Sequence, residues 1–329
     1  MKLTINPQFS PLKSVFSISR GAKTEAKTVT VTLEAGGCTG RGECVPYPRY
    51  GESIASVTQK IEDIRGTIEA GLDRTRLQSL LPAGAARCAV DCALWDLEAK
   101  QTGTPVWKMA GLAPPAAIET AVTVSLDTPD AMGQAAGAID GKLLKLKLGS
   151  DDDIARLEAV HMARPDARLI VDGNEGLSRD AFASFAEAAA NLGVVLIEQP
   201  FPVDADESLA RAQSGLTICA DESVHTSLDI PRLAERYDAV NVKLDKTGGL
   251  TEAIALVEAA RAAEMEIMIG CMVAGSLSMA PALLLAGQAD YVDLDGPLWL
   301  ANDIEHGLTI EGGIIQPCET VLWLSLIHI

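Results

Sequence analysis

The chain has 329 residues, of which 48% are hydrophobic and 22% are charged, so it can bury one large core or two smaller ones. Lys and Arg total 27 against 45 Asp and Glu, and the formal net charge of −18 repels phosphate backbones and anionic lipid alike. We therefore expect no nucleic acid and no membrane among the partners, and the composition excludes a disordered or collagen-like chain.

From the N-terminal residues we expect no export signal and a soluble protein in the cytoplasm. The stretch MKLTINPQFSPLK lacks the apolar segment of about 7–15 residues found in secretory signals, and no run approaches the roughly 18 apolar residues of a membrane span. The seven cysteines are dispersed and include no CxxC pair, which is typical of reduced thiols.

The first 113 residues mix strand-like and helical patterns. The alternating segment KTVTVTLEA (27–35) predicts a strand, and GAARCAVDCALWDLEAKQTG (84–103) predicts a helix that ends at Gly103. The segment GLAPPAA (111–117) is a plausible junction. An α+β domain over residues 1–113 is the simplest account.

Short apolar runs alternate with Ala-rich segments of helical period from about residue 118 onward. The runs lie at 119–126, 142–148, 167–174, 193–200, 216–223, 238–245, 266–272 and 289–296. Such continuous runs are typical of parallel strands buried on both faces, and their interval of roughly 25 residues fits a βαβ repeat. We predict an α/β fold, a (β/α)7β TIM-type barrel, over residues 114–305.

Polar residues end most of these runs, and the C-terminal ends of barrel strands open into the active site. In chain order they are Lys145 and Lys147, Asp172, Glu198, Asp221, Lys243, and finally Asp293 and Asp295. The four histidines have neither a metal-ligand nor a triad neighbourhood, so any chemistry would use carboxylates, lysines or thiols.

Three of the acids, Asp172, Glu198 and Asp221, end consecutive strands. At the barrel mouth they would repel one another by several kcal/mol unless a cation lies between them. Ligation by oxygen alone favours Mg²⁺. Any one acid could instead be a helix N-cap or a salt-bridge partner, but three at matching strand ends favour a metal site.

The lysines flank these acids from opposite directions. Lys145 and Lys147 lie on one side of the second strand, and Lys243 ends the sixth. Beside a divalent cation and another ammonium, a lysine is more easily neutral and can act as a base, although simple salt bridges to the acids remain an alternative. Bases on opposite faces of a bound carboxylate substrate predict 1,1-proton transfer through a metal-stabilised enediolate.

Asp293 and Asp295 lie on the last strand, outside the metal set. They are well placed to bind a cationic group such as an ammonium, so a substrate with both a carboxylate and an amine fits. Helix capping before Gly296 and Pro297 explains their spacing equally well.

In these residues and motifs the chain resembles the enolase superfamily and, within it, the dipeptide epimerases, the L-Ala-D/L-Glu epimerases in particular. The resemblance extends to about residue 313. It is carried by VPYPRYGES (45–53), LPAGAARCAVDCALWDLEA (81–99), KLKL (145–148), IVDGNE (170–175), EQP (198–200), CADES (219–223), VNVKLDKTGGLTEA (240–253), GCM (270–272) and DLDGP (293–297).

The resemblance implies an enolase-like architecture in which residues 1–113, completed by the C-terminal segment 306–329, cap the barrel. It also implies a role for each strand-end residue. Asp172, Glu198 and Asp221 would be Mg²⁺ ligands. Lys147 would be the acid/base for the D-configured centre and Lys243 the acid/base for the L-configured centre, with Lys145 supporting Lys147. Asp293 and Asp295 would clamp the dipeptide ammonium.

Two places depart from the family pattern. Where close relatives offer an arginine to the Glu side chain of the substrate, this chain has Lys23, which lacks the bidentate fork, and Arg20 is close enough to contribute. The tail after residue 313 does not match the family, and it ends in nine almost wholly apolar residues, VLWLSLIHI (321–329). They could be a packed terminal strand, a contact in a homo-oligomer or an artefact of the sequence end.

We expect a Mg²⁺-dependent enzyme, an isomerase that interconverts L-Ala-L-Glu and L-Ala-D-Glu in murein peptide recycling. Alternatives are another dipeptide, a cycloisomerase or o-succinylbenzoate synthase-like reaction with the same lysines and metal, or a carboxylate-binding protein without turnover. The Asp293/Asp295 pair argues against the cycloisomerase and synthase reactions, because their substrates lack an ammonium.

Overall fold

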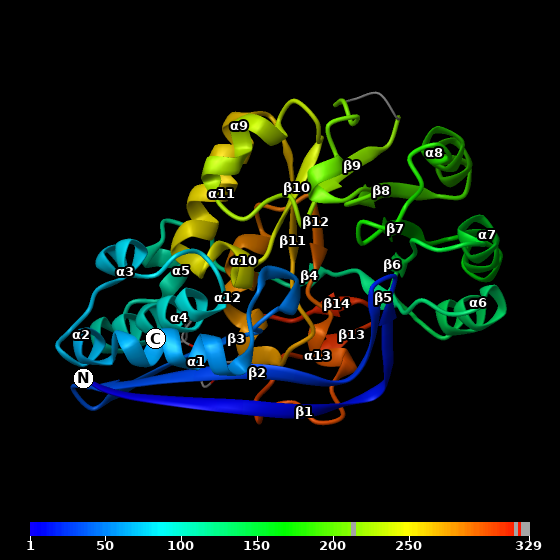
Figure 1. The fold of residues 1–329 in the computed structure, drawn as a ribbon. Coiled ribbons are helices and arrows are strands. Elements are labelled where there is room, and N and C mark those ends of the chain that lie inside the picture. The colour runs from blue at the N-terminus through cyan, green and yellow to red at the C-terminus, as the bar shows by residue number, and fades with distance from the viewer. Residues whose placement is uncertain (212–214, 319–321, 324–329) are drawn as a thin grey trace.

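Two sheets and their covering helices organise the chain, as the computed structural model shows for residues 1–211, 215–318 and 322–323 (Figure 1). Within these residues, a three-stranded antiparallel sheet near the N-terminus lies beside an eight-stranded parallel sheet. No helix in these ranges is both long and apolar enough to cross a membrane.

The N-terminal sheet is formed by β1 (Lys2–Ile18), β2 (Gly21–Ala35) and β3 (Cys38–Cys44). Its main cover is α4 (Ala85–Thr102), which ends at Gly103 with φ of 63°, as the sequence predicts. Gly42 lets β3 lie directly on this helix, because a Cβ there would be 2.2 Å from the Ala89 carbonyl oxygen. The predicted strand 27–35 is the second half of β2, and β1 was not predicted.

Short helices complete this part of the fold. They are η1 (Pro48–Tyr50), α1 (Ile54–Asp63), α2 (Arg65–Glu69), α3 (Arg74–Leu80) and α5 (Val106–Met109). The turn between β1 and β2, together with the segment around η1, reaches toward the barrel and positions side chains above its mouth.

The parallel sheet contains one strand from each predicted run. In order these are β5 (Val122–Val124), β6 (Leu143–Lys147), β7 (Arg168–Asp172), β8 (Val194–Glu198), β9 (Thr217–Ala220), β10 (Ala239–Val242), β11 (Glu266–Gly270) and β12 (Tyr291–Asp293). The Ala121 amide donates to the Val292 carbonyl oxygen at 2.7 Å and joins the two ends of the sheet. The predicted TIM-type barrel is confirmed.

Helices surround the barrel. They are α6 (Pro129–Gly137), α7 (Asp153–Ala163), α8 (Phe182–Asn191), η3 (Ser227–Asp229), α9 (Ile230–Leu233), α10 (Leu244–Thr247), α11 (Leu250–Ala262), α12 (Ser276–Ala286) and α13 (Gly296–Trp299). The described part of the β8–β9 connection contains only the 3-10 turn η2 (Val203–Ala205) instead of an α-helix.

Strand alternation divides the barrel interior into layers. Ala121, Leu143, Ile170, Leu196, Cys219, Ala239 and Met268 form one buried apolar cluster across the strands. Because side chains two residues apart point the same way, the residues two positions further along these strands also point inward, toward the C-terminal mouth. A charged layer therefore lies above an apolar plug.

The segment after α13 returns toward the N-terminal sheet. It first forms β13 (Ile310–Glu311) and β14 (Ile314–Ile315), which pair with each other, and β14 also pairs with β4 (Ile118–Glu119), just before the first barrel strand. Arg41 on β3 then donates to the Leu322 carbonyl oxygen at 2.6 Å. The domain limits 1–113 with 306–329 and 114–305 stay a prediction, and most of the tail 321–329 lies outside the described residues.

Candidate active site

The structure brings the predicted strand-end residues together at the barrel mouth. Lys145 and Lys147 lie on β6, Asp172 and Glu198 end β7 and β8, Asp221 and Lys243 follow β9 and β10, and Asp293 ends β12. Every one of these side chains is buried. Buried charges persist only when they are paired, so their contacts define the site.

Ammonium groups lie among the carboxylates. Lys145 Nζ is 2.6 Å from Glu198 Oε2, 2.7 Å from Asp293 Oδ2 and 3.2 Å from Asp172 Oδ2. Lys147 Nζ is 2.6 Å from the same Asp172 oxygen. The network therefore links β6 to its neighbour β7, to β8 beyond it and, across the barrel mouth, to β12.

Lys243 approaches from the other side. Its Nζ is 2.6 Å from Asp221 Oδ2 and 3.8 Å from Glu198 Oε1. Lys147 and Lys243 thus lie at opposite ends of the row formed by Asp172, Glu198 and Asp221. This is the flanking arrangement that the sequence predicts.

The carboxylates and ammonium groups shift one another's pKa values. Burial alone would raise the pKa of Asp221, but Lys243 and Lys246 hold it well below its ordinary value. For Glu198, burial and the nearby Asp172 raise the pKa to about 7. Burial lowers the pKa of Lys243, yet the carboxylates outweigh it and raise that pKa above its ordinary value. The lowered lysine pKa expected from sequence would need a divalent cation to offset these carboxylates.

Three groups that the sequence pattern did not predict orient the three acids. The Asn174 amide donates to Asp172 Oδ1 at 3.0 Å, and Asn241 Nδ2 donates to Glu198 Oε1 at 2.7 Å. Lys246 Nζ is 2.5 Å from both Asp221 Oδ1 and the Asp221 carbonyl oxygen. Strand alternation could have identified Asn241, since it lies two residues before Lys243 on the same face.

The two acids of the last strand are used differently. Asp293 Oδ2 binds Lys145, whereas Asp293 Oδ1 is buried and has no hydrogen-bond partner in the described residues. Asp295 Oδ2 accepts from the Thr123 amide at 2.7 Å and from Trp299 Nε1 at 3.3 Å. Burial and Asp293 raise the pKa of Asp295 to about 6. Asp293 therefore offers the unused acceptor.

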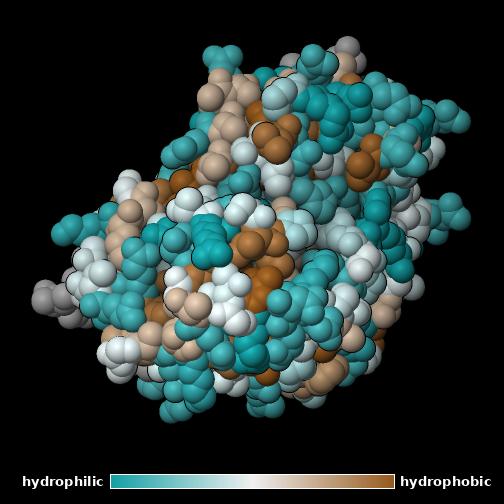
Figure 2. Space-filling view, turned by 60° about the vertical axis from the view of Figure 1, so that its left-hand side comes forward, coloured by the Kyte–Doolittle hydropathy of each residue, from teal (hydrophilic) through white to brown (hydrophobic). Residues whose placement is uncertain are grey.

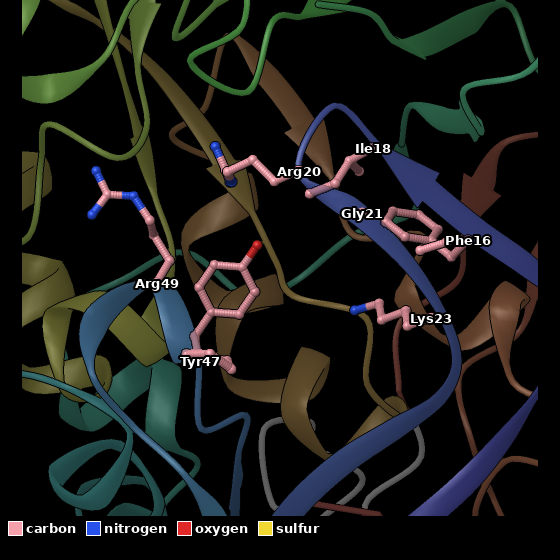
Figure 3. Close-up of a pocket in the computed structure, with 9 residues that line it drawn as sticks. Phe16, Ile18, Arg20, Gly21, Lys23, Tyr47 and Arg49 are labelled. Atoms are coloured by element: carbon pink, nitrogen blue, oxygen red, sulfur yellow. The ribbon is translucent and has the colours of Figure 1, made fainter.

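Side chains of the N-terminal part close over this layer. A small chamber of about 50 Å³ is lined by Phe16 and Lys23 from the β1–β2 hairpin and by Lys147 and Lys243 from the barrel. An outer cavity of about 400 Å³ adjoins it and shares the hairpin side chains (Figure 3). The chamber and cavity together form a path from solvent to the lysines.

Lys23 stands at the boundary of the two spaces. Its Nζ lies 5.1 Å from the centre of the Phe16 ring, and no carboxylate within the described ranges pairs with it. Burial, with Lys147 and Lys243 nearby, lowers the pKa of Lys23 to about 8. An uncommitted ammonium beside a polar chamber is suited to bind an anion.

Arg20 lies on the same hairpin but is already engaged. Its guanidinium donates to Glu222 and to the Asn174 carbonyl oxygen, both at 2.6 Å, and to Glu175 at 3.1 Å. The substrate contact that the sequence suggests for Arg20 stays a prediction.

The donor set suits a hard divalent cation, since Asp172, Glu198 and Asp221 offer only oxygen atoms from neighbouring strands. In the conformation described, no three carboxylate, imidazole or thiol side chains of residues 1–211, 215–318 and 322–323 are arranged to hold one ion. Lys145 and Lys243 lie between the carboxylates instead. A divalent ion held by these acids would compete with the lysines for their oxygen atoms.

The outer surface, unlike the buried active site, is exposed to solvent. The face shown in Figure 2 is largely hydrophilic, with hydrophobic side chains gathered in patches near its centre and upper part. This surface agrees with a strongly charged chain whose apolar residues are mostly buried.

Two family models cover most of the chain. The mandelate racemase / muconate lactonizing enzyme N-terminal domain matches residues 1–111, and the enolase C-terminal domain-like family matches residues 131–320.

Characterised relatives span nearly the same length. The L-Ala-D/L-Glu epimerase of Escherichia coli is 46% identical over 306 residues, which cover 92% of this chain and 95% of that protein. An N-acetyl-D-glutamate racemase of a Pseudoalteromonas species is also 46% identical, over 287 residues that cover 86% and 91% of the two chains.

Solved structures share the fold. An enolase family member from Agrobacterium tumefaciens with homology to dipeptide epimerases, with bound sodium and L-Ala-L-Glu and an ordered loop, has a TM-score of 0.95 and 48% identity, covering 98% of this chain and 99% of that one. A dipeptide epimerase from Enterococcus faecalis in complex with Mg and L-Leu-L-Tyr has a TM-score of 0.90 and 28% identity, covering 97% of both chains.

The substitution Lys246→Met tests how strongly the acids depend on their orienting groups. It removes the lysine donor of Asp221 Oδ1 and the ammonium hydrogen bonds to the carbonyl oxygens of Asp221 and Asn241, so we expect the free energy of unfolding in urea to fall by about 3–5 kcal/mol. Lys142→Met, at an exposed position, is the control and should change it by at most about 0.5 kcal/mol. Equal effects of the two substitutions would contradict this account of Lys246.

Proposed function

This chain belongs to the enolase superfamily, in the mandelate racemase / muconate lactonizing enzyme group, and from that premise we propose that it interconverts L-Ala-L-Glu and L-Ala-D-Glu. It is an isomerase of the kind that epimerises dipeptides or amino acid derivatives. The observation that carries the finer proposal is the placement of Lys147 and Lys243 on opposite sides of one row of carboxylates.

Asp172, Glu198 and Asp221 are the residues that would hold Mg²⁺. When bound, the ion supplies positive charge next to the substrate carboxylate and so makes the neighbouring α-proton more acidic. Asn174, Asn241 and Lys246 contribute by fixing the orientation of the three acids.

Lys147 and Lys243 act at the substrate α-carbon. One takes the α-proton while the other delivers a proton to the opposite face, which inverts the centre. We assign Lys147 to the D-configured centre and Lys243 to the L-configured one. Lys145 keeps its charge beside Asp172 and Glu198, supports Lys147 electrostatically, and adds to the positive field at the developing enediolate.

The two ends of the substrate match the remaining charges. The unpartnered Asp293 Oδ1 would accept from the α-ammonium of the alanine residue, with Asp295 adding negative charge nearby. The uncommitted Lys23 would bind the side-chain carboxylate of the glutamate residue. Lysine binds a carboxylate as a point charge, so we expect a looser preference for glutamate than an arginine would give.

Racemisation of an N-acylated glutamate is a second candidate, because the N-acetyl-D-glutamate racemase has the same 46% identity to this chain as the L-Ala-D/L-Glu epimerase, over 287 rather than 306 residues. The two substrates share the carboxylates and differ in the ammonium. The unpartnered carboxylate oxygen of Asp293 favours the substrate that carries a positive charge. With the dipeptide as substrate, we propose a role in murein peptide recycling in the cytoplasm.

Proton NMR in D₂O with Mg²⁺ tests the reaction. With L-Ala-L-Glu we expect the α-proton signal of the glutamate residue to disappear and D-Glu to be released on later hydrolysis. Omitting Mg²⁺ in the presence of a chelator should stop both changes. N-acetyl-L-Glu, run in parallel, should have the lower kcat/KM, because it brings no ammonium to Asp293.

Failure of this test has two forms. A higher kcat/KM for N-acetyl-L-Glu would replace the proposed substrate with the second candidate. Absence of deuterium incorporation into either compound, by a folded protein that binds Mg²⁺, would reject both.

The preference for glutamate should depend on pH through Lys23. Lys147, Lys243 and the Cys271 thiol face its ammonium. With a pKa of about 8, its charge and the affinity that the charge provides are full well below pH 8 and are lost as the pH rises through that value. The ratio of kcat/KM for L-Ala-L-Glu to that for L-Ala-L-Met should therefore fall by roughly tenfold per pH unit above this pKa.

Taking the ratio cancels the titration of the catalytic lysines, which both substrates share. Lys23→Arg is the matched control, since a guanidinium stays charged and should give a flat ratio. A ratio that falls equally in the wild type and in Lys23→Arg would show that another group controls the preference.

A further inference from the structure

A second charge cluster lies at the barrel rim, outside the reacting layer. Its members are Arg20, Arg49, Glu175 and Glu222. Arg49 donates through Nε and Nη2 to the two oxygens of Glu175, each at 2.8 Å. Arg20 reaches Glu175 at 3.1 Å and Glu222 at 2.6 Å. None of the lysines and carboxylates of the charged layer at the barrel mouth belongs to this cluster.

The two arginines come from separate segments of the N-terminal part. Arg20 lies in the β1–β2 turn, and Arg49 lies in η1. Figure 3 shows them projecting at one side of the outer cavity, with the side chain of Tyr47 beside them. Glu175 accepts hydrogen bonds from both arginines, so one barrel carboxylate holds two covering segments that are far apart in the sequence.

The barrel side of this cluster is rigidly placed. Glu175 follows Asp172 by three residues, and Glu222 directly follows Asp221. Glu175 has φ of 67°, in the left-handed region, where its amide donates to the Gln199 carbonyl oxygen at 2.9 Å. Its side chain is only 8% exposed and accepts a further hydrogen bond from the Val203 amide.

We propose that Glu175 is a positioning residue for the reaction, a joint clasp that holds the β1–β2 hairpin and the η1 segment over the site without touching the substrate. This assignment rests on the proposed function and gives Arg20 to the clasp rather than to the substrate. Phe16 and Lys23 lie on the same hairpin, so the clasp also fixes the ring above Lys147 and the ammonium that would meet the glutamate side chain.

The clasp differs from an ordinary surface salt bridge in its connectivity. Loss of Arg20 should release the hairpin, and loss of Arg49 should release the η1 segment. Loss of Glu175 should release the η1 segment and also loosen the hairpin, which would keep the Arg20 hydrogen bonds to Glu222 and to the Asn174 carbonyl oxygen. Because the arginine side chains are partly exposed, each ion pair with Glu175 is weak on its own. The two pairs together hold the covering segments in place.

Hydrogen exchange of the free enzyme tests this connectivity without substrate. In Glu175→Gln we expect faster exchange of backbone amides in both residues 16–24 and residues 47–52. Arg20→Met should affect the first segment and Arg49→Met the second. Arg179→Met is the matched control, because this rim arginine pairs with Glu207 of the barrel and should leave both segments unchanged.

Kinetics with L-Ala-L-Glu provide the second measurement. Glu175→Gln should raise KM by roughly tenfold while kcat changes less, because the clasp orders the cover and not the reacting atoms. Glu175→Gly, which suits the left-handed backbone, should show the same loss.

Three results would overturn the proposal. Exchange in Glu175→Gln could stay at the wild-type rate, it could increase in one segment alone, or Glu175→Gly could behave as the wild type. The last result would assign the effect to backbone strain. If the wild type does not turn over the dipeptide, the proposed function fails, while the exchange pattern still decides on the clasp.

Discussion

The pairing of buried ammonium and carboxylate groups at the barrel mouth is the interaction on which the rest of the structure depends. Lys145, Lys147, Lys243 and Lys246 meet Asp172, Glu198, Asp221 and Asp293 in one solvent-poor layer. Removing a partner from such a layer leaves an uncompensated buried charge, whereas a bound cation and an anionic substrate can exchange with the lysine contacts. The same pairing therefore stabilises the free protein and prepares it for a charged ligand.

The N-terminal part turns this layer into a selective site. The barrel supplies charge of both signs, but the hairpin brings Phe16 and Lys23 to the boundary between the chamber and the outer cavity. In our account the reacting atoms are set by rigid strands, substrate preference is set by the hairpin, and Glu175 connects the two. Preference and catalysis can then change separately, which agrees with relatives of one fold that act on different dipeptides or on N-acetylglutamate.

Strand alternation made much of the fold and site predictable from sequence. Each apolar run contains a barrel strand, and the polar residue that ends it points inward by simple parity, as with Asp172 two residues after Ile170. Contacts between distant segments were not predictable in this way. The partners of Arg20 lie more than 150 residues away, Lys246 belongs to a short helix beyond its strand, and the contact of Arg41 with Leu322 joins the two ends of the chain.

The central claim is that Lys147 and Lys243 each serve one face of the substrate. The most direct measurement is deuterium exchange at the glutamate α-carbon in D₂O, made on each single alanine variant with each diastereomer. Lys147→Ala should still exchange L-Ala-L-Glu through Lys243 but not L-Ala-D-Glu, and Lys243→Ala should show the reverse, with neither variant inverting the centre. A folded variant that exchanges both diastereomers, or neither, would contradict the two-base account.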